Sequence, residues 1–128
     1  MKNAFIIIFK KLKYYDIPIF ITWNTVLIYL LFFYSSEKDP VVQIIGLDKI
    51  VHIILFTILS IVSYWALSRR AISYLLILSY PILFAISSEL IQHYFIQGRS
   101  GDPLDVIADF IGIAIGIKTA HVIDQMLL

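Results

Sequence analysis

The sequence predicts an all-α integral membrane protein, a four-helix bundle in a single domain over residues 1–128. Of its 128 residues, 60% are apolar and only 15% are charged, and the mean hydropathy is +0.89. A water-soluble domain needs more polar side chains than this to cover its core. The apolar residues also form long continuous runs, which indicate membrane-spanning helices rather than the alternating strands of a membrane barrel.

Four hydrophobic segments predict four spans, at residues 17–34, 47–67, 71–96 and 104–123. A helix needs about 20 apolar residues to cross a hydrocarbon core of roughly 30 Å. The fourth segment is the weakest of the four, because it contains Asp105, Asp109 and Lys118. We therefore place it by the residues that would face the other helices rather than by hydropathy.

The N-terminal residues 2–15 form a separate segment that mixes apolar side chains with lysines and ends in Tyr14 and Tyr15. This composition is typical of an interfacial helix lying on anionic lipid, with its aromatic rings at headgroup depth. The alternative is a basic flank that only sets the topology.

The distribution of lysine and arginine predicts the orientation of the chain. With a cytoplasmic N-terminus, three basic residues lie outside, namely Lys38, Lys49 and Arg99. Seven lie inside, namely Lys2, Lys10, Lys11, Lys13, Arg69, Arg70 and Lys118. Because cytoplasmic loops are enriched in Lys and Arg, we expect both termini in the cytoplasm of a multi-pass plasma-membrane protein.

Composition also excludes some classes of function. The chain has no cysteine, which excludes a disulfide framework, a thiol nucleophile and a thiolate metal site. A net charge of +1 gives no basic field for binding nucleic acid. Membrane lipid is the expected partner, and the sequence predicts no cofactor. It says nothing about oligomeric state.

The polar residues gather at the outer face in this topology. Asp48 and His52 are four residues apart, so they share one face of a helix. An ionised carboxylate within a span costs roughly 2.5–3.5 kcal/mol, so such groups persist only beside counter-charges, protons or water. The candidate ligand-binding or functional cluster is Asp48, Lys49, His52, Glu89, Gln92, Arg99, Asp102, Asp105 and Asp109.

One stripe of the fourth span joins this cluster to a packing surface. Asp105, Asp109, Gly112 and Gly116 follow at intervals of four, three and four residues, which places them on one helix face. Two glycines four residues apart allow a second helix to approach closely. The glycines therefore point this face, with its two carboxylates, toward the other helices.

These motifs together resemble the VanZ-like family of small bacterial membrane proteins, over about residues 47–116. The family usually has Asn where this chain has Asp109, so a possible charge is added there. The resemblance rests on Asp48-Lys49-Ile50-Val51-His52 with Phe56, Glu89-Leu90-Ile91-Gln92, Gly98-Arg99-Ser100-Gly101-Asp102, and Asp105-Val106 running to Gly112 and Gly116.

The resemblance implies a bacterial envelope location and antibiotic resistance of the teicoplanin type, and no reaction. Our first hypothesis is that the outward-facing cluster binds an anionic amphiphile. This would be a lipid-linked cell-wall precursor or a lipoglycopeptide, with Arg99 and Lys49 meeting the anion.

Three alternatives stay open. The cluster could belong to an intramembrane hydrolase or transferase acting on a lipid headgroup, with His52 or Glu89 as general base and Arg99 stabilising negative charge. It could be purely structural and tie helices together. The third alternative is a metal site, for which nitrogen and oxygen ligands are present, but the compact motif that would predict one is absent, so we assign no metal. Those ligands are His52, Glu89, His93, Asp105 and Asp109.

Overall fold

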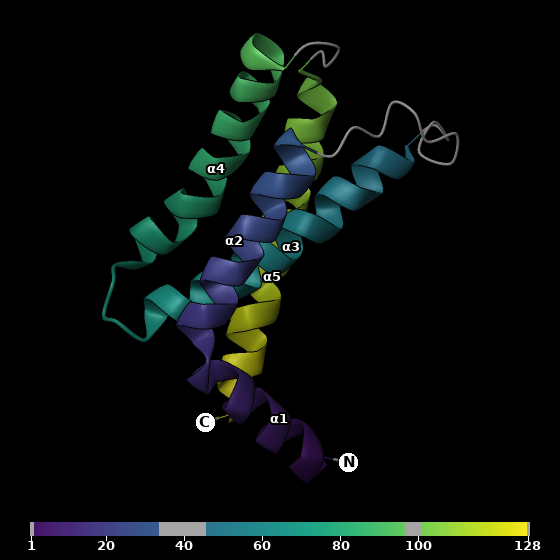
Figure 1. Cartoon of the computed structure of the whole chain (residues 1–128). Helices are drawn as coiled ribbons and strands as arrows, with labels where there is room; N and C mark the ends of the chain where they lie inside the picture. The colour runs from purple at the N-terminus through teal and green to yellow at the C-terminus, as the bar shows by residue number, and fades with distance from the viewer. Residues whose placement is uncertain (1, 34–45, 97–100, 128) are drawn as a thin grey trace.

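The computed structural model describes residues 2–33, 46–96 and 101–127, and no strand occurs among them (Figure 1). The all-α prediction is therefore confirmed for the described part of the chain. Its helices are α1 (Lys2–Tyr14), α2 (Asp16–Phe32), α3 (Leu47–Ser68), α4 (Tyr74–Phe95) and α5 (Pro103–Leu127).

Three helices, α3, α4 and α5, are long and apolar enough to cross a membrane. At a rise of 1.5 Å per residue, the 22 residues of α3 or α4 extend about 33 Å, slightly more than a hydrocarbon core. The 17 residues of α2 extend only about 25 Å. Helices α1 and α2 are long and apolar enough for a span only when they are taken together, and the chain bends by 75° between them. The fourth span remains a prediction.

The N-terminal segment forms a helix of its own, α1, which leaves the bundle at an angle below α2 (Figure 1). Its Phe9 packs edge-on against Trp65 of α3, with ring centroids 5.9 Å apart. The chain turns at Tyr15, and Asp16 then begins α2 by accepting a hydrogen bond from the Ile17 amide. That α1 lies along a membrane surface remains a prediction.

Helix α3 is the centre of the fold and packs against α2, α4 and α5. Phe56 and Leu59 of α3 and Leu27 of α2 are fully buried in the core. The direction of the chain alternates, so α3 and α5 run parallel to each other (Figure 1).

The stripe of α5 that holds the two glycines lies against α3. A Cβ at Gly112 would overlap the Ile53 carbonyl, and one at Gly116 would overlap the Thr57 carbonyl. The Thr57 hydroxyl donates a hydrogen bond to the Gly112 carbonyl at 3.1 Å. Because no side chain separates them, the two backbones pack directly against each other.

The two ends of the bundle differ in what they hold. Both chain termini lie at one end, here called the terminal end (Figure 1). The first turns of α3 and α5 and the last turns of α4 meet at the opposite end, here called the site end. The orientation of the termini relative to the membrane remains a prediction.

Candidate functional site

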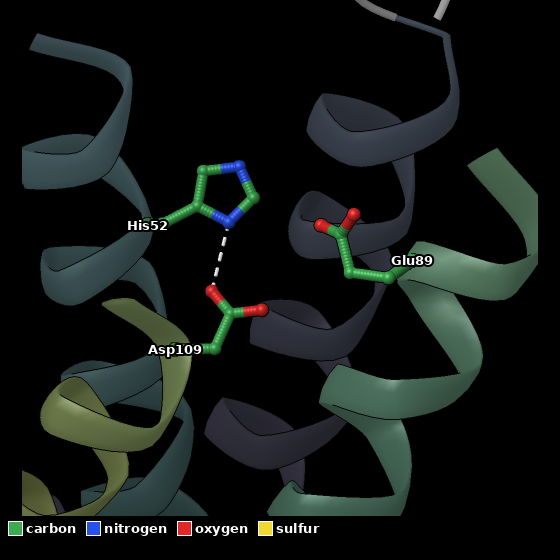
Figure 2. A group of neighbouring side chains, drawn as sticks. All are labelled: His52, Glu89 and Asp109. Carbon is green, nitrogen blue, oxygen red and sulfur yellow. Dashed lines mark hydrogen bonds and ion pairs between the residues drawn. The ribbon is translucent and has the colours of Figure 1, made fainter. Parts of the chain in front are cut away.

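Three helices each contribute one ionisable side chain to the site end, of which Glu89 and Asp109 are buried and His52 is partly buried. His52 lies in the second turn of α3, Asp109 in the second turn of α5 and Glu89 in the last two turns of α4. Figure 2 shows Glu89 facing His52 and Asp109 from the opposite side of the space between the helices. We call these three residues the triad.

The imidazole of His52 is bonded to the carboxylate of Asp109. Nδ1 of His52 lies 2.8 Å from Oδ1 of Asp109, and Nε2 lies 3.9 Å from Oδ2 of Asp105. The side chain of Asp109 is 0% exposed, and its Oδ2 atom has no hydrogen-bond partner among the described residues. The parallel register of α3 and α5 explains this pairing, because it places successive turns of the two helices opposite each other.

Glu89 is the triad member whose buried carboxylate has the fewest polar contacts among the described residues. It is only 7% exposed, and neither of its carboxylate oxygens has a hydrogen-bond partner in the described parts of the chain. One ligand atom from each triad residue can be chosen so that all three lie within 4.8 Å of one another. A buried carboxylate without a partner is costly, so this arrangement favours a proton, water or a cation between the groups.

Lys49 organises the remaining acids at the site end. Its ammonium donates to Asp48 at 2.8 Å, to Asp102 at 2.7 Å and to Asp105 at 2.5 Å. The pKa of the Asp102 carboxyl is lowered, chiefly by the hydrogen bond from Lys49 and then by the Leu104 amide. An ammonium has three N–H donors, and three carboxylates accept from this one.

The occupied donors of Lys49 change the expected electrostatics of the site. Lys49 has no N–H left to offer to an external anion unless one of its carboxylates is displaced. The other cation of our first hypothesis, Arg99, lies outside the described residues. In the described part of the site end one ammonium therefore faces five acids, namely Asp48, Glu89, Asp102, Asp105 and Asp109.

Gln92, which the sequence also placed in the cluster, holds two helices together. Its side-chain amide donates to the Leu31 carbonyl of α2 at 2.8 Å, and the residue is buried. This bond ties the last turn of α2 to α4. His93, one turn after Glu89, lies on an exposed face of α4.

A groove between α4 and α5, with a volume of about 570 Å³, was not foreseen from the sequence. It begins at Phe110, the residue after Asp109, and extends to Lys118 and His121 near the terminal end. Its walls are otherwise mostly apolar. In sequence such residues look the same as residues that face lipid, so no signal could have identified it. The lining is Tyr74, Leu78, Ile82, Phe110, Ile113, Ala114, Ile117, Lys118 and His121.

Comparison with known proteins gives a family but no reaction. A 72-residue stretch, 55% of this chain, is 33% identical to the uncharacterized protein C11E3.10 of Schizosaccharomyces pombe. It covers 44% of that protein, so the chain spans less than half the length of this relative. No solved structure matches the chain. Residues 4–124, from α1 to the last turns of α5, match the VanZ/LLP1 family, and the chain is therefore a membrane protein of that family.

Proposed function

We propose that this protein binds an amphiphile from the membrane, with the headgroup at the site end and the apolar chain in the groove between α4 and α5. The observation that carries the proposal is that the groove and two members of the triad share the helices α4 and α5, with the triad nearer the site end. Glu89 and Asp109 lie on the same two helices that line the groove, and Phe110 follows Asp109 directly. A ligand with a polar end and an apolar tail matches this order.

The size of the groove supports a chain-like ligand. From Phe110 to His121 the helix rises about 16 Å, which is roughly the length of a medium acyl chain. Its volume of about 570 Å³ falls within the range of roughly 300–1,000 Å³ of ordinary ligand pockets. In Figure 1, α4 and α5 separate from each other toward the terminal end, where Tyr74 and His121 line the groove.

The ligand that fits best with the family resemblance is a lipid-linked cell-wall precursor or a lipoglycopeptide, in a bacterial plasma membrane. Either has an anionic headgroup and an apolar tail. We propose that the protein contributes to teicoplanin tolerance by binding such a ligand. Arg99 is the basic residue that we propose for the headgroup, because the donors of Lys49 are occupied.

Binding to protein in lipid nanodiscs tests this proposal, with a fluorescent lipid-linked precursor and a fluorescent lipoglycopeptide as probes. We expect saturable binding, weakened at least tenfold by Ala114→Phe, which fills the groove. Ile115→Phe is the matched control, because this neighbouring side chain is exposed and lies outside the groove. Absence of saturable binding, or equal binding by both variants, would refute the proposal.

The orientation of the ligand needs its own control. A ligand bound with its headgroup at Lys118 would lose affinity in Lys118→Ala and keep it in Arg99→Ala. The proposed orientation gives the opposite result. For the resistance role, a teicoplanin-sensitive host that expresses the chain should tolerate more drug, and Glu89→Gln at equal membrane level should not provide this tolerance.

A second function, hydrolysis or group transfer on a lipid headgroup, is favoured by the His52–Asp109 pair. A carboxylate bonded to one imidazole nitrogen orients the ring and strengthens the other nitrogen as a base. The hydroxyl of Ser88 is buried and donates to the Ala85 carbonyl, so an activated water molecule is the better nucleophile. A time course with labelled lipids tests this function, and unchanged lipid at high enzyme concentration would exclude it.

A further inference from the structure

We propose that His52, Glu89 and Asp109 bind a divalent metal ion, with Zn²⁺ as the best-matched candidate. The three side chains come from three different helices and converge on one buried space (Figure 2). This site goes beyond amphiphile binding and does not depend on it, because metal binding is measured without a lipid ligand.

The distances suit a shared ion. The chosen ligand atoms lie within 4.8 Å of one another. Around a tetrahedral Zn²⁺, bonds of about 2.0–2.2 Å place the ligand atoms about 3.3–3.6 Å apart. The longest separation in the triad therefore has to shorten by at most about 1.5 Å, which is within the reach of side-chain rotation. The ion would take the place between His52 and Asp109 that a hydrogen occupies in their present bond.

The unsatisfied oxygens provide evidence that is independent of the cluster itself. Both oxygens of Glu89 and Oδ2 of Asp109 are buried and without a hydrogen-bond partner within the described residues. Buried polar atoms are almost always paired, and each exception calls for an explanation such as a bound water, ion or proton. These three atoms lie on the two carboxylates that face each other across the triad.

Charge also favours a divalent ion. Two carboxylates and a neutral imidazole carry a charge of −2, which a divalent cation neutralises. Lys49 does not provide this charge, because its ammonium is occupied by Asp48, Asp102 and Asp105. Imidazole nitrogen combined with carboxylate oxygen suits Zn²⁺ and related transition metals better than Ca²⁺.

Three protein ligands leave a coordination position open, as in catalytic rather than structural zinc sites. Water or an anionic oxygen would complete the coordination there. The competing arrangement without metal has a proton on Glu89 and a charged pair between His52 and Asp109. It also balances charge, so the experiment must distinguish a metal ion from a proton.

The experiment uses full-length protein purified in detergent through a tag without histidine and then stripped with a chelator. Zn²⁺ is titrated, and metal content is measured after gel filtration. We expect about one Zn²⁺ per chain and a rise in the unfolding temperature with added Zn²⁺, because the ion binds the folded state. Glu89→Gln, Asp109→Asn and His52→Gln should each weaken binding at least tenfold.

Asp124→Asn is the matched control, because it neutralises a carboxylate at the terminal end, and it should bind Zn²⁺ like the parent. Absence of retained Zn²⁺, Mn²⁺ and Fe²⁺ in the parent chain would overturn the proposal. Parent-like binding by Glu89→Gln would overturn it as well. If the variants do not fold, the parent's metal content and its temperature shift decide the question alone.

Discussion

The two ends of the bundle handle buried charge in opposite ways. At the terminal end each described acid meets a basic partner. Asp16, only 8% exposed, accepts from Arg70 at 3.1 Å, and Arg69 lies 3.8 Å away. Lys13 bonds Asp124 at 2.5 Å and thereby ties α1 to α5.

The described part of the site end has more acids than bases, and its most buried acids, Glu89 and Asp109, have no Lys or Arg partner among the described residues. Lys49 forms ion pairs with Asp48, Asp102 and Asp105, which are the more exposed acids. Glu89 and Asp109 lie close to His52 instead. The terminal end is thus complete within the chain, which is typical of a structural network. The site end is incomplete, which is typical of a place where something from outside binds.

The largest expected effect is from Lys49→Met. It leaves three carboxylates close together without a cation, and removal of one partner from a partly buried ion pair costs roughly 3 kcal/mol. We expect the free energy of unfolding in detergent to fall by about that amount. Lys49→Arg should recover part of it, since charge is kept. An unchanged stability of Lys49→Met would show that the acids at this end are protonated.

Neutralising an acid should have opposite signs at the two ends. Without metal, Glu89→Gln removes an uncompensated buried carboxyl, so we expect stability to rise by about 1 kcal/mol, as at many functional sites. Asp16→Asn should lower stability, because Arg70 then loses its partner. Unfolding in the presence of a chelator compares the two variants. A loss of stability in both would mean that Glu89 has a structural partner.

A smaller effect is expected from Arg70→Ala. The side chain of Arg70 is 43% exposed, so its bond to Asp16 is partly screened, and we expect a loss of about 1 kcal/mol. A double-mutant cycle with Asp16→Asn isolates the pair. Binding of Zn²⁺ should be unchanged in this variant, because the terminal end and the site end are independent. Altered metal binding would contradict that separation.

The smallest effect is expected from Asp124→Asn, which removes the bond between Lys13 and Asp124. Partly exposed ion pairs contribute about 0.5 kcal/mol. The expected signature is therefore local rather than global. Hydrogen exchange in α1 should become faster while exchange in α3 stays the same. Equal acceleration in both helices would show that α1 and the bundle unfold together.

Hydropathy located the helices well, because the length of an apolar run reflects membrane thickness. The second span was predicted at residues 47–67, and α3 is Leu47–Ser68. The fourth was predicted to end at 123, but α5 continues to Leu127, because a helix can extend beyond the apolar layer that hydropathy detects. The first segment was predicted to start at residue 17, and α2 starts at Asp16.

The candidate site could be predicted only in part. The spacing of Asp105, Asp109, Gly112 and Gly116 identified one face of α5, since a helical period converts spacing into direction. The spacing could not show that α3 is the helix that packs against this face of α5. It also could not show that Lys49 donates all three of its hydrogen bonds to nearby acids. Those facts depend on how separate helices are placed in space. The sequence also shows no compact metal motif, because the three triad residues come from three different helices and lie far apart along the chain.

The backbone contact at Gly112 and Gly116 has a mechanical consequence. It fixes α3 and α5 to each other next to His52 and Asp109, so these two side chains keep their position relative to each other. Glu89 is on α4, which the groove separates from α5 at Tyr74, Leu78 and Ile82, toward the terminal end. A ligand that enters the groove and moves α4 away from α5 would therefore change the distance from Glu89 to the other two side chains. The His52–Asp109 bond would stay the same.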